Sequence, residues 1–209
     1  MKKLFLLITA FVMTVSANAQ DAVGTLSLKP MAGVTIANFI GKDAEGTDPK
    51  IGAIFGGELI YQVTNYCSLS AGLLYSMQGC SADGEGDPKV SLDYLNLPLL
   101  ANFYVFKGFA LKAGFQFGYL TRAKVSGSGD GIKAEVDMKD ACNDFDFSIP
   151  IGISYDINNS FVIEGRYNVG ITKPGKSDYS FMGETFHDDD NNIRNSVFQI
   201  TLGYKFALK

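Results

Sequence analysis

An alternating stretch from Tyr94 to Tyr104 most constrains how this chain can fold. Every second residue in it is apolar, namely Leu95, Leu97, Leu99, Ala101 and Phe103. The residues between them are mostly polar or small, namely Asn96, Pro98, Asn102 and Tyr104. A period of two is typical of a β-strand with two unlike faces. About ten residues is also the length that a tilted strand needs to cross the hydrocarbon of a bilayer. The stretch therefore predicts a strand that could span a membrane.

The same alternation recurs along the chain, and short turns alternate with long connections between the copies. The expected strands are Leu26–Ala37, Ile51–Val63, Cys67–Gln78, Tyr94–Phe106, Phe109–Val125, Phe145–Ile157, Phe161–Ile171 and Val197–Leu208. Antiparallel strands joined in this way are typical of outer-membrane barrels, and closure leaves no strand edge unpaired. We therefore expect an all-β fold, a closed eight-stranded antiparallel up-and-down transmembrane β-barrel.

The first nineteen residues predict a secretory signal peptide. Lys2 and Lys3 give a basic start, residues 4–15 form an apolar run, and Ala17-Asn18-Ala19 supplies the small residues of a cleavage site. The apolar run is too short for a spanning helix. We expect residues 1–19 to be removed and residues 20–209 to form one outer-membrane β-barrel domain.

Negative charge is concentrated in the long connections. Sixteen of the 22 acidic residues fall in the segments Asn38–Lys50, Cys80–Val90, Ser126–Asp144 and Pro174–Arg194. The formal net charge of -4 argues against a nucleic-acid partner, which would need a clustered basic surface. Apart from the signal peptide, no run approaches the length of a transmembrane helix.

Composition indicates which face of the strands points outward. The apolar face carries large residues and no charge between its ends. The other face is mostly Gly, Ser, Thr, Asn and Gln, with a few charges of mixed sign, namely Lys29, Glu58, Lys112, Asp146, Asp156, Glu164, Arg166 and Lys205. Such a face suits a crowded interior in which charges pair with one another. We expect lipid outside; the alternative is a soluble exported lipocalin-like binding barrel with its apolar side inward.

Aromatic residues are expected to form girdles at the two membrane boundaries. One girdle falls near the short turns and comprises Tyr61, Tyr66, Phe106, Phe109, Tyr155, Phe161, Tyr204 and Phe206. Tyr75, Tyr94, Tyr119 and Phe145 could begin the opposite girdle. Pro98 and Pro150 lack the N–H that a closed barrel uses, so we expect a β-bulge at each, with the ring facing the lumen.

The three cysteines leave two alternatives open. Cys67 and Cys80 lie at opposite ends of one expected strand and cannot meet. Cys80 and Cys142 both lie in long connections at the same end, so they could form a disulfide in an exported protein. Three free thiols are the other alternative. A metal site would need more ligands than these.

Several motifs resemble the PorT-like outer-membrane β-barrel family. The strongest is Tyr94-Leu95-Asn96-Leu97-Pro98-Leu99-Leu100, which is similar to the Tyr-Leu-x-hydrophobic-Pro-Leu-Leu core of that family. Gly79, the stretch Arg166-Tyr167-Asn168-x-Gly170 and the closing Leu202-Gly203-Tyr204-Lys205-Phe206 are also similar. The resemblance implies an eight-stranded barrel in the outer membrane of a diderm (Gram-negative) bacterium, inserted by the barrel assembly machinery. The chain departs from the usual aromatic ending of an assembly signal, because Ala207-Leu208-Lys209 follow Phe206.

The sequence offers few candidates for chemistry. His187, the only histidine, precedes Asp188-Asp189-Asp190, and it could form a rim His–Asp pair or a weak Ca²⁺ site. A solvated acidic loop is the preferred interpretation. Asp83, Glu85 and Asp87 could likewise hold a cation, but a flexible glycine-rich loop explains them better. No phosphate-binding loop, nucleophile elbow or zinc motif is present. We therefore predict no catalytic, cofactor-binding or metal-binding residue and no cofactor.

The function expected from the sequence is that of a small non-enzymatic outer-membrane barrel with acidic extracellular loops. Its expected partners are outer-membrane lipid, the assembly machinery and a protein or surface ligand that meets the long loops. The alternatives are an outer-membrane enzyme that acts at the rim on lipid or peptide, with His187 as base, and the soluble binding barrel. The lumen is expected to be plugged by salt bridges, because eight strands enclose only enough room for side chains.

Overall fold

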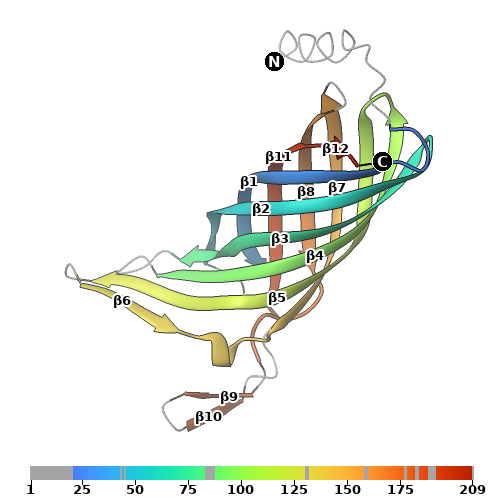
Figure 1. Cartoon of the computed structure of the whole chain (residues 1–209). Helices are drawn as coiled ribbons and strands as arrows, with labels where there is room; N and C mark the ends of the chain where they lie inside the picture. The colour runs from blue at the N-terminus through green and yellow to red at the C-terminus, as the bar shows by residue number, and fades with distance from the viewer. Residues whose placement is uncertain are drawn as a thin grey trace.

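Eight long antiparallel strands close into a barrel in the computed structural model (Figure 1), which describes residues 21–42, 44, 46–82, 88–129, 132–157, 160–176, 178–181, 184–187 and 192–208. The barrel strands are β1 (Leu26–Ile40), β2 (Thr47–Thr64), β3 (Cys67–Ala82), β4 (Lys89–Phe106), β5 (Phe109–Gly129), β7 (Phe145–Ile157), β8 (Phe161–Gly170) and β11 (Arg194–Tyr204). Each strand pairs with its neighbour in the chain, and β1 pairs with β11 from Met31↔Gly203 to Ile40↔Arg194. That last pairing closes the sheet and confirms the predicted fold.

The described residues also form four shorter strands and one turn of helix. β6 (Ile132–Asp137) pairs with β5 and extends it, β12 (Phe206–Ala207) pairs with β1, and η1 (Lys139–Ala141) is a 3₁₀ turn. β9 (Asp178–Phe181) and β10 (Glu184–His187) form a separate two-stranded hairpin. Among the described segments, no helix is long and apolar enough to cross a membrane. The predicted signal peptide, residues 1–19, lies outside the described residues.

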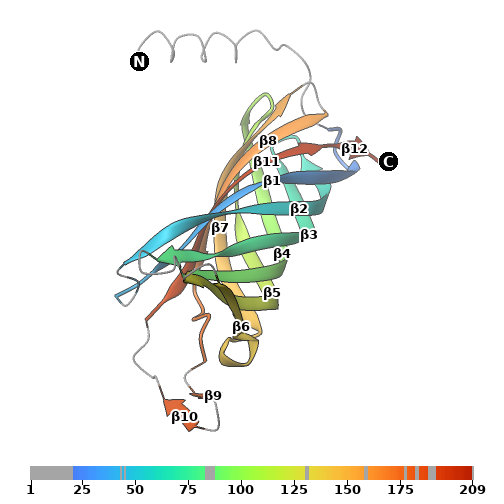
Figure 2. The ribbon, with the colours of Figure 1, turned by 90° about the vertical axis from the view of Figure 1, so that its left-hand side faces the viewer.

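The two ends of the barrel differ. At the short-turn end, tight turns join β2 to β3 and β4 to β5, and this is also the end at which β1 begins and β11 ends. At the opposite, long-loop end, β4, β5 and β6 project past β7 and β8 (Figure 1), and the β9–β10 hairpin lies beyond the same end (Figure 2). The sequence prediction made these strands too short at the long-loop end. β4 begins at Lys89 rather than Tyr94 and β5 ends at Gly129 rather than Val125. Pairing continues where the apolar alternation stops, because strands in water do not need an apolar face.

The apolar face points outward, as predicted. Leu69, Phe103 and Phe115 are each about half exposed, whereas Glu58, Arg166 and Gln199 are about 1% exposed on the opposite, lumenal face. A soluble lipocalin-like barrel would show the reverse pattern. The soluble alternative is therefore wrong, and the outer surface between the barrel ends is an apolar belt.

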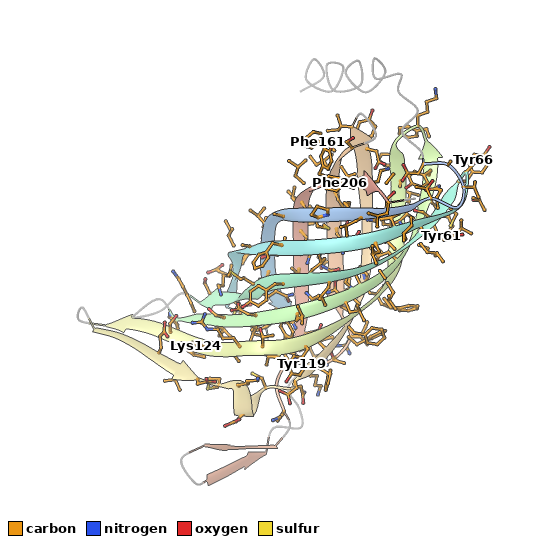
Figure 3. The ribbon with its side chains drawn as sticks, in the orientation of Figure 1. Tyr61, Tyr66, Tyr119, Lys124, Phe161 and Phe206 are labelled. Carbon is orange, nitrogen blue, oxygen red and sulfur yellow. The ribbon has the colours of Figure 1, made fainter. Side chains whose placement is uncertain are left out.

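The predicted aromatic girdle at the short-turn end is confirmed. Figure 3 shows Tyr61, Tyr66, Phe161 and Phe206 around that end, and the rings of Phe161 and Tyr204 lie 5.0 Å apart. At the long-loop end, the ring of Tyr119 contacts that of Phe145 at 5.5 Å and the ring of Tyr75 contacts that of Phe55 at 5.3 Å.

Tyr94 does not belong to the second girdle. It is 1% exposed and faces the lumen, because it has the same parity as Asn96 and Pro98 on β4. The sequence prediction for this residue is therefore wrong.

Pro98 and Pro150 face the lumen as expected, but neither causes a bulge. Both rings are buried, and the register on each side of Pro98 and Pro150 is unchanged. The ladder only skips the pairs beside each proline, between β3 and β4 and between β5 and β7. The missing N–H is thus accommodated by local loss of pairing rather than by an extra residue. The register shifts between β4 and β5 lie instead between Asp93 and Tyr94 and between Tyr104 and Phe106.

A charge placed on the belt is expected to destabilise the barrel according to its depth. Leu99 lies midway along the outward face of β4, and Leu99→Arg should lower the free energy of unfolding by about 2–4 kcal/mol. Val105 is also exposed but lies next to Phe106 in the girdle, so Val105→Arg should cost only about 0–1 kcal/mol. Urea unfolding in phospholipid vesicles measures both. Equal costs for the two variants would contradict the assignment of the belt to lipid.

Candidate functional site

A cluster of five charged side chains fills the middle of the lumen. Lys29 comes from β1, Glu58 from β2, Lys112 from β5, and Glu164 and Arg166 from β8. The Nζ of Lys29 lies 2.8 Å from Oε2 of both Glu58 and Glu164. The Nζ of Lys112 lies 2.6 Å from Oε2 of Glu164 and 3.4 Å from Oε2 of Glu58. Arg166 donates to both carboxylates, with 2.5 Å between its Nη2 and Oε1 of Glu58. We call these five residues the lumen cluster.

Local sequence places these side chains and makes room for them. Lys29 and Glu58 lie directly opposite each other on β1 and β2. A Cβ on Gly72 would lie 2.7 Å from Cγ of Glu58, and one on Gly203 would lie 2.9 Å from Cγ of Lys29. Lumenal glycines thus provide the volume that the long charged side chains occupy, as the composition predicted.

The lumen cluster blocks the barrel rather than lining a channel. Each of its side chains is at most 4% exposed, and each carboxylate meets three cations. Buried charges are tolerated only when they are paired and hydrogen-bonded in this way. Neither Glu58 nor Glu164 is free to exchange protons with a substrate, so the cluster is suited to a plug and not to general acid–base chemistry.

Further polar contacts close the lumen on both sides of this cluster. At the short-turn end, the Nζ of Lys205 lies 2.6 Å from Oδ2 of Asp156 and 3.4 Å from Oδ2 of Asp21. Toward the long-loop end, the Nδ2 of Asn195 donates to the hydroxyl of Tyr94 at 3.4 Å and to Oδ1 of Asp146 at 3.2 Å. The bore is therefore filled at three levels. The lumenal charges predicted from alternation are all brought together in these contacts.

An apolar pocket at the long-loop end was not predicted. It has a volume of about 230 Å³ and is lined by Phe39, Val90, Leu92, Met138, Cys142 and Pro174, among others. Its floor is an inner apolar cluster of Leu92, Tyr94, Leu120 and Ala123. The lining comes from five separate segments of the chain, which no local sequence pattern links. The only signal in the sequence is the pair of apolar residues Met138 and Ala141 within an acidic segment.

The cysteines are all free thiols, so the disulfide between Cys80 and Cys142 is wrong. Cys80 is buried at the end of β3 opposite Val90, whereas Cys142 packs against the inner apolar cluster. The two lie at the same end, as predicted, but each has its own packing site. Burial raises the pKa of the Cys142 thiol, which makes it a poor nucleophile at neutral pH.

The loop residues considered for chemistry gain no defined site. His187 ends β10, where its backbone pairs with Asp178. Asp188–Asp190 and Asp83, Glu85 and Asp87 lie outside the described residues. Within the described part of the chain, no group of three or more His, Cys, Asp or Glu could hold a metal ion. The prediction that His187 has no catalytic role therefore stays a prediction.

Removing one carboxylate from the lumen cluster should strongly destabilise the barrel. Glu164→Gln leaves three buried cations with a single counter-charge, which should lower the free energy of unfolding by about 3–5 kcal/mol. Adding Lys112→Met restores the original charge balance, so the double variant should recover about 0.5–3 kcal/mol. Urea unfolding in vesicles, followed by the unheated mobility of the folded band on gels, measures this coupling. Additive costs in the double variant would contradict an electrostatic plug.

Comparison with known proteins agrees with this geometry. Neisserial surface protein A matches with a TM-score of 0.51 and 11% identity, over 87% of this chain and 97% of that one. Ail, the attachment invasion locus protein of Yersinia pestis, in complex with the heparin analogue sucrose octasulfate, matches with a TM-score of 0.50 and 16% identity, over 88% and 100%. Among curated proteins, none matches. The family described as "Outer membrane protein beta-barrel domain" matches residues 18–174, so this chain belongs to the outer-membrane β-barrel proteins.

Proposed function

We propose that this chain is a non-enzymatic outer-membrane scaffold whose projecting strands and acidic loops bind a partner outside the cell. The observation that carries the proposal is the contrast between a blocked lumen and a tall outer wall. The lumen cluster fills the bore, so transport through it is disfavoured. The wall, in contrast, is much longer than spanning requires.

Strand lengths measure this excess. A tilted strand crosses the hydrocarbon in about 9–11 residues. β8 has 10 residues and β11 has 11, whereas β4 has 18 and β5 has 21. In outer-membrane barrels the long connections face outward. The extra length of β4 and β5, together with β6, therefore projects beyond the cell surface on one side of the barrel. A purely structural membrane protein has no need of such a wall.

The charge of the loops narrows the class of partner. The four acidic segments named above hold sixteen Asp and Glu against seven Lys and Arg. A surface of this composition favours a cationic or neutral partner through electrostatic complementarity. The heparin analogue named for Ail is an anion, which acidic loops would repel, so we do not extend that ligand to this chain.

The finer assignment to the PorT-like family rests on the β4 motif around Pro98 and its buried ring.

Site-specific photocrosslinking on intact cells tests this proposal. A photoreactive residue in place of Val136, which is exposed on β6, should give a crosslinked adduct with an extracellular partner. The same residue in place of Val105, which is exposed in the belt near the short-turn end, serves as the matched control. An adduct from both positions, or from neither, would contradict a partner at the projecting wall. Loss of lipid modification or proteolysis in a His187→Ala variant would favour the enzyme alternative instead.

A further inference from the structure

A polar cleft lies on the outer surface of the barrel wall, just beyond the apolar belt at the long-loop end. Its volume is about 180 Å³. The residues that give it its chemistry are Lys50 from β2, Ser91 and Asp93 from β4, Arg122 and Lys124 from β5, and Glu135 from β6. Figure 3 shows Lys124 on the projecting part of the wall, beyond Tyr119. We call this feature the rim cleft.

A β-bulge places the cations of the rim cleft on the outer surface. Asp93 pairs with Arg122, but the next pair is Tyr94 with Leu120, so Thr121 is an extra residue in β5. The insertion changes the phase of the alternation. Leu120 and Ala123 both face inward, at 0% and 1% exposure, and the side chain of Arg122 points out and is 52% exposed. Without the bulge, Arg122 would enter the lumen.

The carboxylates of the rim cleft do not neutralise its cations. Lys124 pairs with Glu135 at 2.7 Å, and this contact holds the pKa of the Glu135 carboxyl below its usual range. Arg122 approaches Asp93 only at 3.9 Å, and the same Asp93 oxygen also accepts a hydrogen bond from the Tyr75 hydroxyl.

Lys50 has no carboxylate within salt-bridge distance among the described residues. Its ammonium donates to the hydroxyl of Ser91 at 2.7 Å and to the carbonyl of Gln78 at 3.2 Å, both of which are neutral acceptors. Partial burial lowers the pKa of this ammonium group, which is the effect expected where counter-charge is insufficient. An ammonium has three donors, and a guanidinium has five. The rim cleft therefore has one net positive charge and unused donors.

The position of the rim cleft selects the kind of anion. Met77 faces outward and lines the side of the cleft that is nearest the belt. On the same strand as Arg122, the ring of Tyr119 has the ammonium of Lys139 5.7 Å from its centre, so a further cation lies at the aromatic boundary of the belt. This depth is that of lipid headgroups. A molecule with acyl chains on the belt and a phosphate in the cleft would satisfy both surfaces, which free phosphate cannot do.

We propose that the rim cleft binds the phosphorylated headgroup of an outer-leaflet lipid through Lys50, Arg122 and Lys124. Ammonium and guanidinium groups that line one cleft are a recurrent arrangement for binding phosphate oxygens. The cleft borders the belt, because Ile51 and Met77 both line it and face outward, so a headgroup can reach it from the lipid side. The proposal does not rest on the partner proposed above, because its evidence is the charge of the cleft and the position of the cleft beside the belt.

Native mass spectrometry of the detergent-purified full barrel tests the proposal, with phosphorylated lipid A and its dephosphorylated form as probes. The wild type should retain the phosphorylated probe preferentially. The double variant Lys50→Met/Arg122→Met should lose roughly tenfold in affinity for it and show no preference. The matched control is Lys42→Met/Lys107→Met, which removes two exposed cations elsewhere and should keep the preference. The mobility of the unheated band confirms that each variant is folded.

Three results would overturn the proposal. One is equal retention of both probes by the wild type. Another is an unchanged preference in the Lys50→Met/Arg122→Met variant. The third is displacement of the lipid probe by inorganic phosphate at a similar concentration, which would mean that the cleft binds any phosphate and not a lipid headgroup.

Discussion

The structure depends on one constraint: every backbone N–H and C=O within lipid must find its partner in the protein. A sheet can meet this requirement only by closing on itself, and the pairing of β1 with β11 does so. Closure with eight strands then determines the width of the bore, which leaves room only for side chains. The inside-out distribution of residues follows, because the belt must match acyl chains while the bore must be filled.

The narrow bore explains why charges and glycines occur together on the lumenal face. A filled interior could be apolar, but the face opposite the belt here is built from small polar residues and a few long charged ones. Gly72 and Gly203 leave space against Glu58 and Lys29, and Arg166 reaches across from β8 to the carboxylate on β2. Because the bridges of Lys112 and the Arg166–Glu58 bridge join strands that are not neighbours, they fix the cross-section of the barrel as well as blocking it. Breaking them would leave buried charges without partners.

The membrane-spanning part of the barrel is predicted well from the sequence, because the alternation of apolar and polar residues determines it. Strict alternation identified which side of each strand faces lipid and therefore which charges meet in the lumen, such as Glu164 and Lys112. It could not identify their partners, because pairing across the bore depends on tilt and register that no local pattern contains. It also misplaced Tyr94 and the bulges at the two prolines. A strand can accommodate the missing N–H of proline either by losing a ladder pair or by inserting a residue, and the sequence does not distinguish these two outcomes. The rim cleft and the pocket around Met138 were missed because each combines residues from several distant segments.

The bulge at Thr121 marks where the governing rule changes. Between the bulge and the short-turn end, apolar side chains point out of the barrel and polar ones point into the lumen. Toward the long-loop end, Leu92 and Ala123 join Leu120, the last residue before the bulge, in an apolar cluster inside, while Asp93, Arg122 and Lys124 lie on the outside. The wall therefore switches from the pattern of a membrane protein to that of a water-soluble one within a few residues of the same strands. One inserted residue in β5 achieves part of this inversion without ending the pairing with β4, so the wall can rise out of the bilayer as a continuous sheet. The position of the inversion, next to Tyr75 and Tyr119, locates the outer boundary of the membrane independently of the aromatic girdle.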